Sequence, residues 1–218
     1  MIDEGDGRDI GYDQQGKGAI MAAFDFEQLV FSGGGIRCFW HGGFLAAAGD
    51  ALALKPERIS TVSGGALSAA AWIANRERAL LDAMVNAFAN NDLRWTHSIG
   101  LEGKRVDMRQ AARDGKLIDL ICAAATIPPV FDVPEWNGLR VLDGGIFDKA
   151  PLPKPDIGNT LLLLTSRYRN LPRIDRRTYI QPSEEVAADK IDFSDKLKVE
   201  DTWAQGERDG KAWVARNG

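Results

Sequence analysis

The sequence predicts an α/β fold with a central, mostly parallel sheet and helices between its strands. Three observations lead to this prediction. Short apolar runs of strand length alternate with segments in which apolar residues recur at helical spacing. Glycine clusters at 33–35 and 64–65 follow directly after two of these runs. The length of 218 residues suits one domain with one sizeable hydrophobic core.

Each predicted element follows from the pattern of its own residues. Apolar and β-branched runs predict strands at 28–31, 58–62, 139–143, 160–166 and 178–182. Apolar residues at intervals of three and four predict helices around 40–47, 67–74, 77–90 and 199–215. Residues 91–113 show no clean period, so we place no element there.

Composition narrows the class of protein. We expect a polar, mobile arm over residues 1–20 and a single domain over 21–218. The amino-terminal sequence lacks the pattern of a secretory signal, and no apolar run is long enough to span a bilayer. A net charge of -4 argues against nucleic acid as a partner. Two cysteines without a disulfide pattern favour a reducing compartment, so we expect a cytoplasmic protein.

The segment ISTVSGGALSAAAW (59–72) is typical of a nucleophile elbow. A strand runs directly into Ser63, two glycines follow, and an alanine-rich helix begins. Such a sharp turn raises a serine hydroxyl above the sheet, and the amino end of the helix favours negative charge beside it. Ser-Gly-Gly is also typical of a helix N-cap in a tight turn, and on this feature alone that simpler interpretation is favoured.

A nucleophilic serine needs a base, and the sequence points to a carboxylate. The order serine, acid, histidine cannot be completed, because no histidine follows His97; we interpret His41 and His97 as structural or surface residues. Asp143 ends an apolar run and precedes two glycines, so we expect it at the same sheet edge as Ser63. Asp-Gly-Gly is also a common turn sequence. Only its combination with the serine turn and the glycine run favours catalysis.

The run LVFSGGGIRC (29–38) places three glycines after a strand, where a ligand, an anion or a neighbouring backbone must come close. A phosphate-binding P-loop needs a lysine and a serine or threonine after its last glycine, and neither is present. A dinucleotide-binding loop needs glycine at the sixth position, where Cys38 stands.

These residues resemble the patatin-like phospholipases and lipid acyl hydrolases. That family carries, in order, a G-G-G-x-R-G loop, a G-x-S-x-G elbow and a D-G-[GA] motif. The chain has GGGIRC (33–38), TVSGG (61–65) and DGG (143–145), and AAATIPPVFDV (123–133) is similar to the family's approach to its last motif. The resemblance spans roughly residues 28–155 and implies the family's three-layer α/β fold.

The resemblance also implies an activity, a serine lipid acyl hydrolase of the phospholipase A or lysophospholipase type. Ser63 would be the nucleophile and Asp143 its base. Four glycines would contribute backbone N–H groups to an oxyanion hole: Gly33, Gly34, Gly35 and Gly64. Arg37 would support this loop, by bracing it rather than by its charge. We expect no metal or other cofactor, because no ligand cluster has credible spacing.

Two residues depart from the family pattern. Thr61 stands where the elbow usually has its first glycine, and Cys38 replaces the glycine that closes the first motif. A β-branched side chain at Thr61 could crowd the strand against the helix. The alternative function is therefore a catalytically weak or inactive domain that binds lipid or a protein partner.

The implied partner is a lipid or phospholipid acyl ester. The segment SRYRNLPRIDRR (166–177) carries five arginines, which fit either peripheral contact with an anionic membrane surface or a solvated loop. Trp203 and Trp213 on the last predicted helix could touch lipid, but core packing is favoured.

Overall fold

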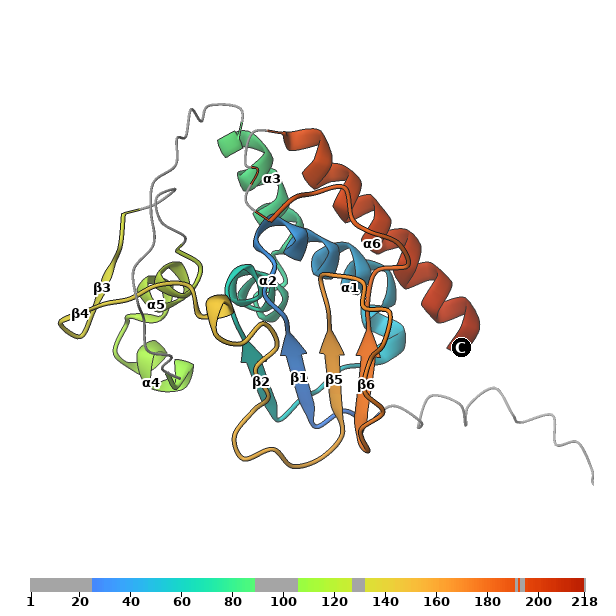
Figure 1. The fold of residues 1–218 in the computed structure, drawn as a ribbon, viewed down its shortest axis with the longest axis horizontal. Coiled ribbons are helices and arrows are strands. Elements are labelled where there is room, and N and C mark those ends of the chain that lie inside the picture. Colours follow the sequence, from blue (N-terminus) through green and yellow to red (C-terminus); the bar gives the residue numbers. More distant parts are fainter. Residues whose placement is uncertain (1–24, 89–105, 127–131, 191, 193–194, 218) are drawn as a thin grey trace, which may run out of the picture.

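The computed structural model describes residues 25–88, 106–126, 132–190, 192 and 195–217. Its centre is a four-stranded sheet of order β2–β1–β5–β6 in which every neighbouring pair is parallel (Figure 1). The strands are β1 (Gln28–Phe31), β2 (Arg58–Thr61), β5 (Thr160–Leu163) and β6 (Arg177–Ile180). The predicted α/β class, with a parallel sheet flanked by helices, is confirmed. The predicted arm over 1–20 lies outside the described residues.

The helices that pack on the sheet follow the predicted pattern. After the glycine run, a short 3-10 turn, η2 (Gly35–Cys38), leads into α1 (Phe39–Leu52). The second strand leads into α2 (Gly64–Ile73) and then α3 (Glu77–Phe88). The last helix, α6 (Lys196–Asn217), lies along α1 (Figure 1). In the described ranges, no helix has both the length and the apolar character needed to cross a membrane.

A smaller group of elements lies beyond β2 (Figure 1). It contains α4 (Met108–Arg113), α5 (Leu117–Ala124) and a hairpin of β3 (Glu135–Trp136) and β4 (Leu139–Arg140), and η3 (Gly144–Ile146) leads back to the sheet. No periodic pattern in the sequence predicts α4, which is only six residues long and packs against α5.

The predicted strand over 139–143 is wrong in extent and in partner. Only Leu139 and Arg140 are in strand, paired antiparallel with β3 rather than added to the central sheet. The cause is the turn at Asn137 and Gly138, both of which have positive φ and reverse the chain after two residues of β3. Asp143 instead caps η3, where its side chain accepts a hydrogen bond from the Gly145 N–H.

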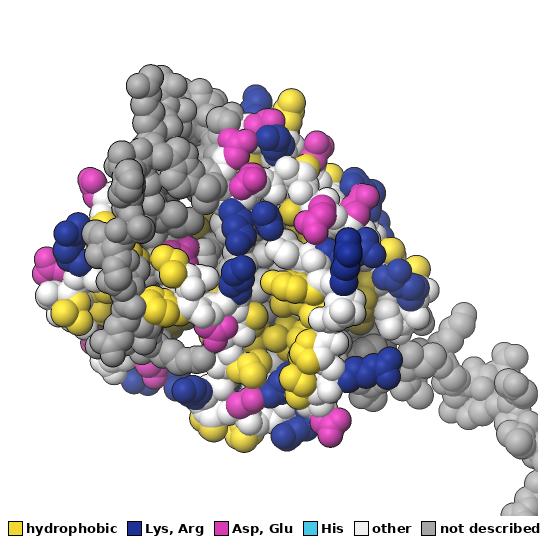
Figure 2. All heavy atoms as spheres, viewed as in Figure 1, with side chains coloured by type: hydrophobic (Ala, Val, Ile, Leu, Met, Phe, Trp, Pro, Cys, Tyr) yellow, Lys and Arg dark blue, Asp and Glu magenta, His cyan; other side chains and the backbone are white. Residues whose placement is uncertain are grey.

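The two faces of the sheet are covered differently. Leu29, Phe31, Leu161 and Leu163 are fully buried on one face, in the main core with apolar residues of α1 and α2. On the opposite face, Val30, Leu162 and Leu164 pack with Tyr179 of β6 and with three side chains of connecting segments: Ala150, Leu152 and Leu171. Helices α1, α2 and α6 therefore cover the first face. Connecting segments cover the second, which is the face seen in Figure 2.

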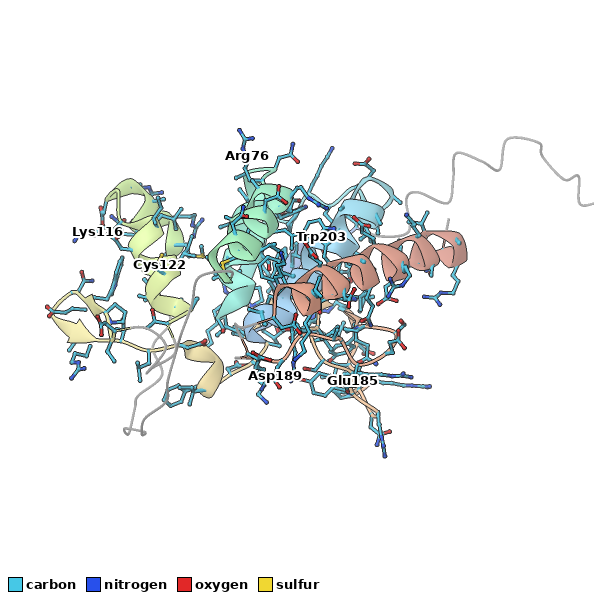
Figure 3. The ribbon with its side chains drawn as sticks, turned by 90° about the horizontal axis from the view of Figure 1, so that it is seen from above. Arg76, Lys116, Cys122, Glu185, Asp189 and Trp203 are labelled. Carbon is cyan, nitrogen blue, oxygen red and sulfur yellow. The ribbon has the colours of Figure 1, made fainter. Side chains whose placement is uncertain are left out.

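Helices α1 and α6 meet through glycines and one tryptophan. A Cβ atom on Gly43 would collide with the Trp203 carbonyl oxygen, and one on Gly206 would lie 2.8 Å from the Phe44 nitrogen. Trp203, which is 5% exposed, lies where α6 meets the other helices (Figure 3). The core position predicted for this tryptophan is confirmed, and Trp213 also packs against the main core.

This backbone contact predicts the effect of adding a single methyl group. Gly206→Ala should lower the free energy of unfolding by about 1–3 kcal/mol, because the backbone of α1 has no room for it. Gly49→Ala is the matched control, since no atom lies within 4 Å of the position its Cβ would take. We expect it to raise stability by about 0.4–1 kcal/mol. Denaturant unfolding of both variants tests this, and equal effects would contradict the close contact.

Candidate active site

The glycine loop after β1 is held between Thr165 and Lys190. The Ser32 hydroxyl accepts a hydrogen bond from the Thr165 N–H at 3.1 Å, and the Thr165 hydroxyl donates to the Gly33 carbonyl at 2.7 Å. A side chain on Gly34 would collide with Thr165, and one on Gly35 would collide with the Lys190 carbonyl. Gly35 also has φ of 59°, a conformation that favours glycine. The loop therefore needs glycine here for space as well as for backbone conformation.

Ser63 lies in a sharp turn between β2 and α2. Its φ of 55° and ψ of -140° are rarely adopted by residues other than glycine, and such outliers gather at functional sites. The turn is packed tightly against the glycine loop: a Cβ on Gly65 would lie 2.6 Å from the Phe31 carbonyl, and one on Gly64 would lie 3.0 Å from the Cys38 sulfur. This is the geometry expected of a nucleophile elbow.

Asp143 reaches Ser63 from the connection that follows the β3–β4 hairpin. Its backbone N–H donates to the Thr126 carbonyl at 3.1 Å, and its Oδ1 accepts from the Gly145 N–H at 2.7 Å. Its other oxygen, Oδ2, accepts a hydrogen bond directly from the Ser63 hydroxyl. The two side chains, eighty residues apart in sequence, are both buried, with exposed fractions of 4% for Ser63 and 5% for Asp143.

The environment of Asp143 raises its pKa. Burial is the main cause, because it penalises the charged carboxylate. The hydrogen bonds from Ser63 and Gly145 and the positive charge of Lys190 oppose this effect but do not cancel it. A carboxylate with a raised pKa is a better proton acceptor than an ordinary aspartate once it is ionised.

The four predicted oxyanion glycines differ in whether their N–H groups are available. The Gly33 N–H donates to the Lys149 carbonyl at 2.8 Å, so it is occupied within the protein. Among the described residues, the N–H groups of Gly34, Gly35 and Gly64 have no acceptor. Gly33 instead places its backbone against Ser63, whose Cβ would lie 3.1 Å from a Cβ at this position.

Three further predicted residues surround the loop and the elbow. The Arg37 guanidinium donates to the Ser166 hydroxyl at 3.1 Å, which ties η2 to the segment after β5. Cys38 is buried beside Gly64, and its sulfur contacts the Ser32 carbonyl at 3.5 Å. Burial, and secondarily the Asp143 charge, raises the pKa of this thiol far above its usual range. The Thr61 hydroxyl faces Met108 of α4, with 3.9 Å between oxygen and sulfur.

His41 is not part of this arrangement. His41 is fully buried in α1, where Nε2 lies 3.1 Å from the Leu163 carbonyl oxygen and Phe31 packs edge-on against the ring. Burial lowers its pKa to about 4, so the ring is neutral at physiological pH. His97 lies outside the described residues. In the ranges that the structure describes, no three His, Cys, Asp or Glu side chains gather closely enough to hold a metal ion.

The basic segment 166–177 does not form one patch. It runs from the carboxyl end of β5 to the amino end of β6, on opposite edges of the sheet. Arg177 is bound to Asp156 and Thr160, and Arg167 donates to the Ser183 carbonyl at 2.6 Å.

Sequence reasoning missed three residues that shape the site: Thr165, Lys149 and Lys190. Thr165 and Lys190 pack against the glycine loop, and the Lys149 carbonyl accepts a hydrogen bond from the Gly33 N–H. Their contacts join positions more than a hundred residues apart, so no local pattern could reveal them. The only feature of the sequence that points to any of them is the position of Lys149, six residues after Asp143.

Comparison with known proteins agrees with this geometry. The family model described as patatin-like phospholipase matches residues 29–106 and 103–155, a span that includes the glycine loop, the serine elbow and Asp143. No curated protein matches the chain significantly. The matched span covers more than half of the sequence and has its three motifs at one edge of a parallel sheet, so the chain belongs to the patatin-like phospholipase family.

Proposed function

We propose that this protein is a serine lipid acyl hydrolase that cleaves carboxylic esters with a dyad of Ser63 and Asp143. The observation that carries the proposal is the direct hydrogen bond from the Ser63 hydroxyl to Asp143 within a buried elbow. Membership of a family of hydrolases that act on lipids supports the reaction class. The proposed substrates are acyl esters of lipids or phospholipids.

In the proposed reaction, Asp143 accepts the Ser63 proton as the serine oxygen attacks the ester carbonyl. The tetrahedral intermediate collapses when its bond to the leaving oxygen breaks, and Asp143 returns the proton to that oxygen, releasing the alcohol. Water then attacks the acyl-serine and gives a proton to Asp143. Breakdown of the second intermediate returns that proton to Ser63 and releases the fatty acid.

We assign the oxyanion hole to the N–H groups of Gly34, Gly35 and Gly64. Their lack of acceptors among the described residues supports this assignment, and the engaged N–H of Gly33 excludes it as a donor. The amino end of α2 adds a favourable dipole. Each such donor is typically worth about 2.7–4 kcal/mol of transition-state stabilisation.

We further propose that the protein meets lipid as a peripheral protein from the cytoplasmic side. Ile146 and Phe147 directly follow the glycines after Asp143 and are 64% and 51% exposed, so two apolar side chains stand beside the dyad. Such side chains gain free energy by entering a lipid surface. Both cysteines are free, which fits a reducing compartment.

The second candidate is an inactive domain that binds lipid or a protein partner, favoured by Thr61 and Cys38. A fluorophosphonate probe separates the two functions, because it reacts only with an activated serine. Labelling of wild type that is lost in Ser63→Ala supports the hydrolase. Folded protein that stays unlabelled supports the inactive domain.

The dyad predicts the effect of removing either member. Ser63→Ala and Asp143→Asn should each abolish hydrolysis of a neutral p-nitrophenyl ester, since no second nucleophile or base contacts these side chains among the described residues. The matched control is Asp50→Asn, an exposed aspartate of α1, which should keep wild-type turnover. Circular dichroism establishes that each variant is folded. Substantial activity in folded Asp143→Asn would overturn the assignment of the base.

The raised pKa of Asp143 predicts a pH dependence. Hydrolysis requires the ionised carboxylate, so kcat/KM should fall as pH decreases, with a midpoint above the ordinary value of 3.8. Stability should respond with the opposite sign. Because folding favours the protonated form, the stability this group contributes is present at low pH and is lost as pH rises through its folded pKa.

Two measurements test this prediction together. Wild-type kcat/KM recorded from neutral to acidic pH should show the acid limb while circular dichroism remains unchanged. Asp143→Asn should gain thermal stability over wild type at neutral pH, and the gain should shrink in acid. An acid limb centred below 3.8 would contradict the effect of burial.

The position of Thr61 predicts that this departure from the family pattern does not disable the enzyme. Its hydroxyl faces Met108 of α4, and the elbow forms with threonine in place. Thr61→Gly should therefore change turnover by less than about tenfold, while a glycine in β2 lowers stability by roughly 0.5–1 kcal/mol. Turnover and thermal midpoint measured on the same preparation test this. A larger fall in turnover with an intact fold would give Thr61 a direct role in the site.

A further inference from the structure

Positive charge is concentrated at the rim of the glycine loop. Three cationic side chains gather there: Lys190, and two that lie close enough to act on its charge, Lys149 and Arg37. We call them the cationic cluster. Dark-blue side chains gather in the middle of the face seen in Figure 2, above an apolar area. The chain as a whole has a net charge of -4, so this concentration is not a reflection of its composition.

Backbone hydrogen bonds place Lys149 and Lys190 beside the glycine loop. The Lys149 carbonyl accepts the Gly33 N–H at 2.8 Å, and the Lys190 carbonyl accepts the Ile36 N–H at 3.4 Å. Both lysine side chains therefore start from the two flanks of the same loop. Arg37 belongs to η2, directly after that loop, and is tied to Ser166. The positive charge of Lys190 also acts on Asp143 and lowers its pKa, so the cluster lies within electrostatic range of the dyad.

The other two cations oppose the positive charge of Lys190. Burial, then the charges of Lys149 and Arg37, lowers the pKa of Lys190. Among the described residues, none of the three cations forms an ion pair with an aspartate or glutamate. Asp148 accepts a hydrogen bond from the Ala150 N–H at 3.1 Å. Of the groups that shift the pKa of Lys190, Asp189, labelled in Figure 3, has the smallest effect. An anion bound between these cations would remove their repulsion.

We propose that Lys149 and Lys190 are specificity-determining residues that bind a phosphate group of the substrate, so that the enzyme prefers phosphate-bearing acyl esters to neutral ones. This rests on the proposed function, because the phosphate must belong to the ester whose carbonyl reaches Ser63. Two ammonium groups can donate charge-assisted hydrogen bonds to phosphate oxygens while the acyl carbonyl enters the glycine loop. The bound phosphate then offsets the repulsion between the cations, and the cations orient the ester.

A matched pair of small esters isolates the phosphate from any membrane surface. Both 1-hexanoylglycerol 3-phosphate and 1-hexanoylglycerol stay monomeric at low concentration and differ only in the phosphate. Calorimetry with Ser63→Ala protein measures binding without turnover, and wild-type kcat/KM measures hydrolysis. We expect the phosphate ester to bind at least tenfold more tightly and to react with at least tenfold higher kcat/KM.

The variants test which residues are responsible. Lys149→Gln/Lys190→Gln should reduce both ratios at least tenfold, while Lys211→Gln, a matched change on an exposed lysine of α6, should leave them unchanged. The ratio is the informative quantity, because a change in the pKa of Asp143 affects both esters equally. Inorganic phosphate should weaken binding of the phosphate ester in wild-type background and not in the double variant.

The outcomes separate this proposal from the hydrolase assignment. Hydrolysis of both esters without a phosphate preference, or a preference that survives in the folded double variant, would overturn the phosphate site and leave the hydrolase standing. Phosphate-dependent binding to protein that hydrolyses neither ester and resists fluorophosphonate would overturn the hydrolase and leave the phosphate site standing.

Discussion

The site depends on the close approach of two backbone turns at one edge of the sheet. The glycine loop after β1 and the first turn of α2 touch through backbone atoms, with the space for side chains on Gly35, Gly64 and Gly65 filled by neighbouring main chain. Parallel pairing of β1 and β2 brings both strands to that edge in register. This contact encloses Ser63, whose backbone conformation is rare for a residue other than glycine.

Polar burial is the cost of this arrangement. Ser63 and Asp143 are withdrawn from water, and burial disfavours the ionised carboxylate that the proposed reaction needs. Three local features offset part of that cost: the serine hydrogen bond, the Gly145 N–H and the nearby charge of Lys190. The same burial raises the pKa of Asp143, which suits the role of base that we propose for it. His41, the histidine that the structure describes, is neutral in the core.

The sequence predicted those parts whose pattern is local. Strands β1, β2, β5 and β6 and the long helices follow from periodicity, because a buried strand or helix face repeats at a fixed interval. The order of the three motifs along the chain predicted that Ser63 and Asp143 lie together. Periodicity failed around 139–143, where the Asn137–Gly138 turn overrode an apolar run. It could not reveal the walls of the glycine loop, since Thr165 and Lys190 reach it only through the tertiary fold.

Asp143 lies in a connection and not in a strand of the central sheet. Related proteins can therefore differ around it without a change in that sheet. Its position depends on local bonds to Thr126 and Gly145 and on the contact with Ser63. The hairpin that precedes it forms a separate two-stranded sheet. Insertions or deletions in that hairpin leave the strand register unchanged. Evolution can therefore reshape the surroundings of Asp143, and with them the choice of substrate in the proposed reaction, while Ser63 and the central sheet stay constant.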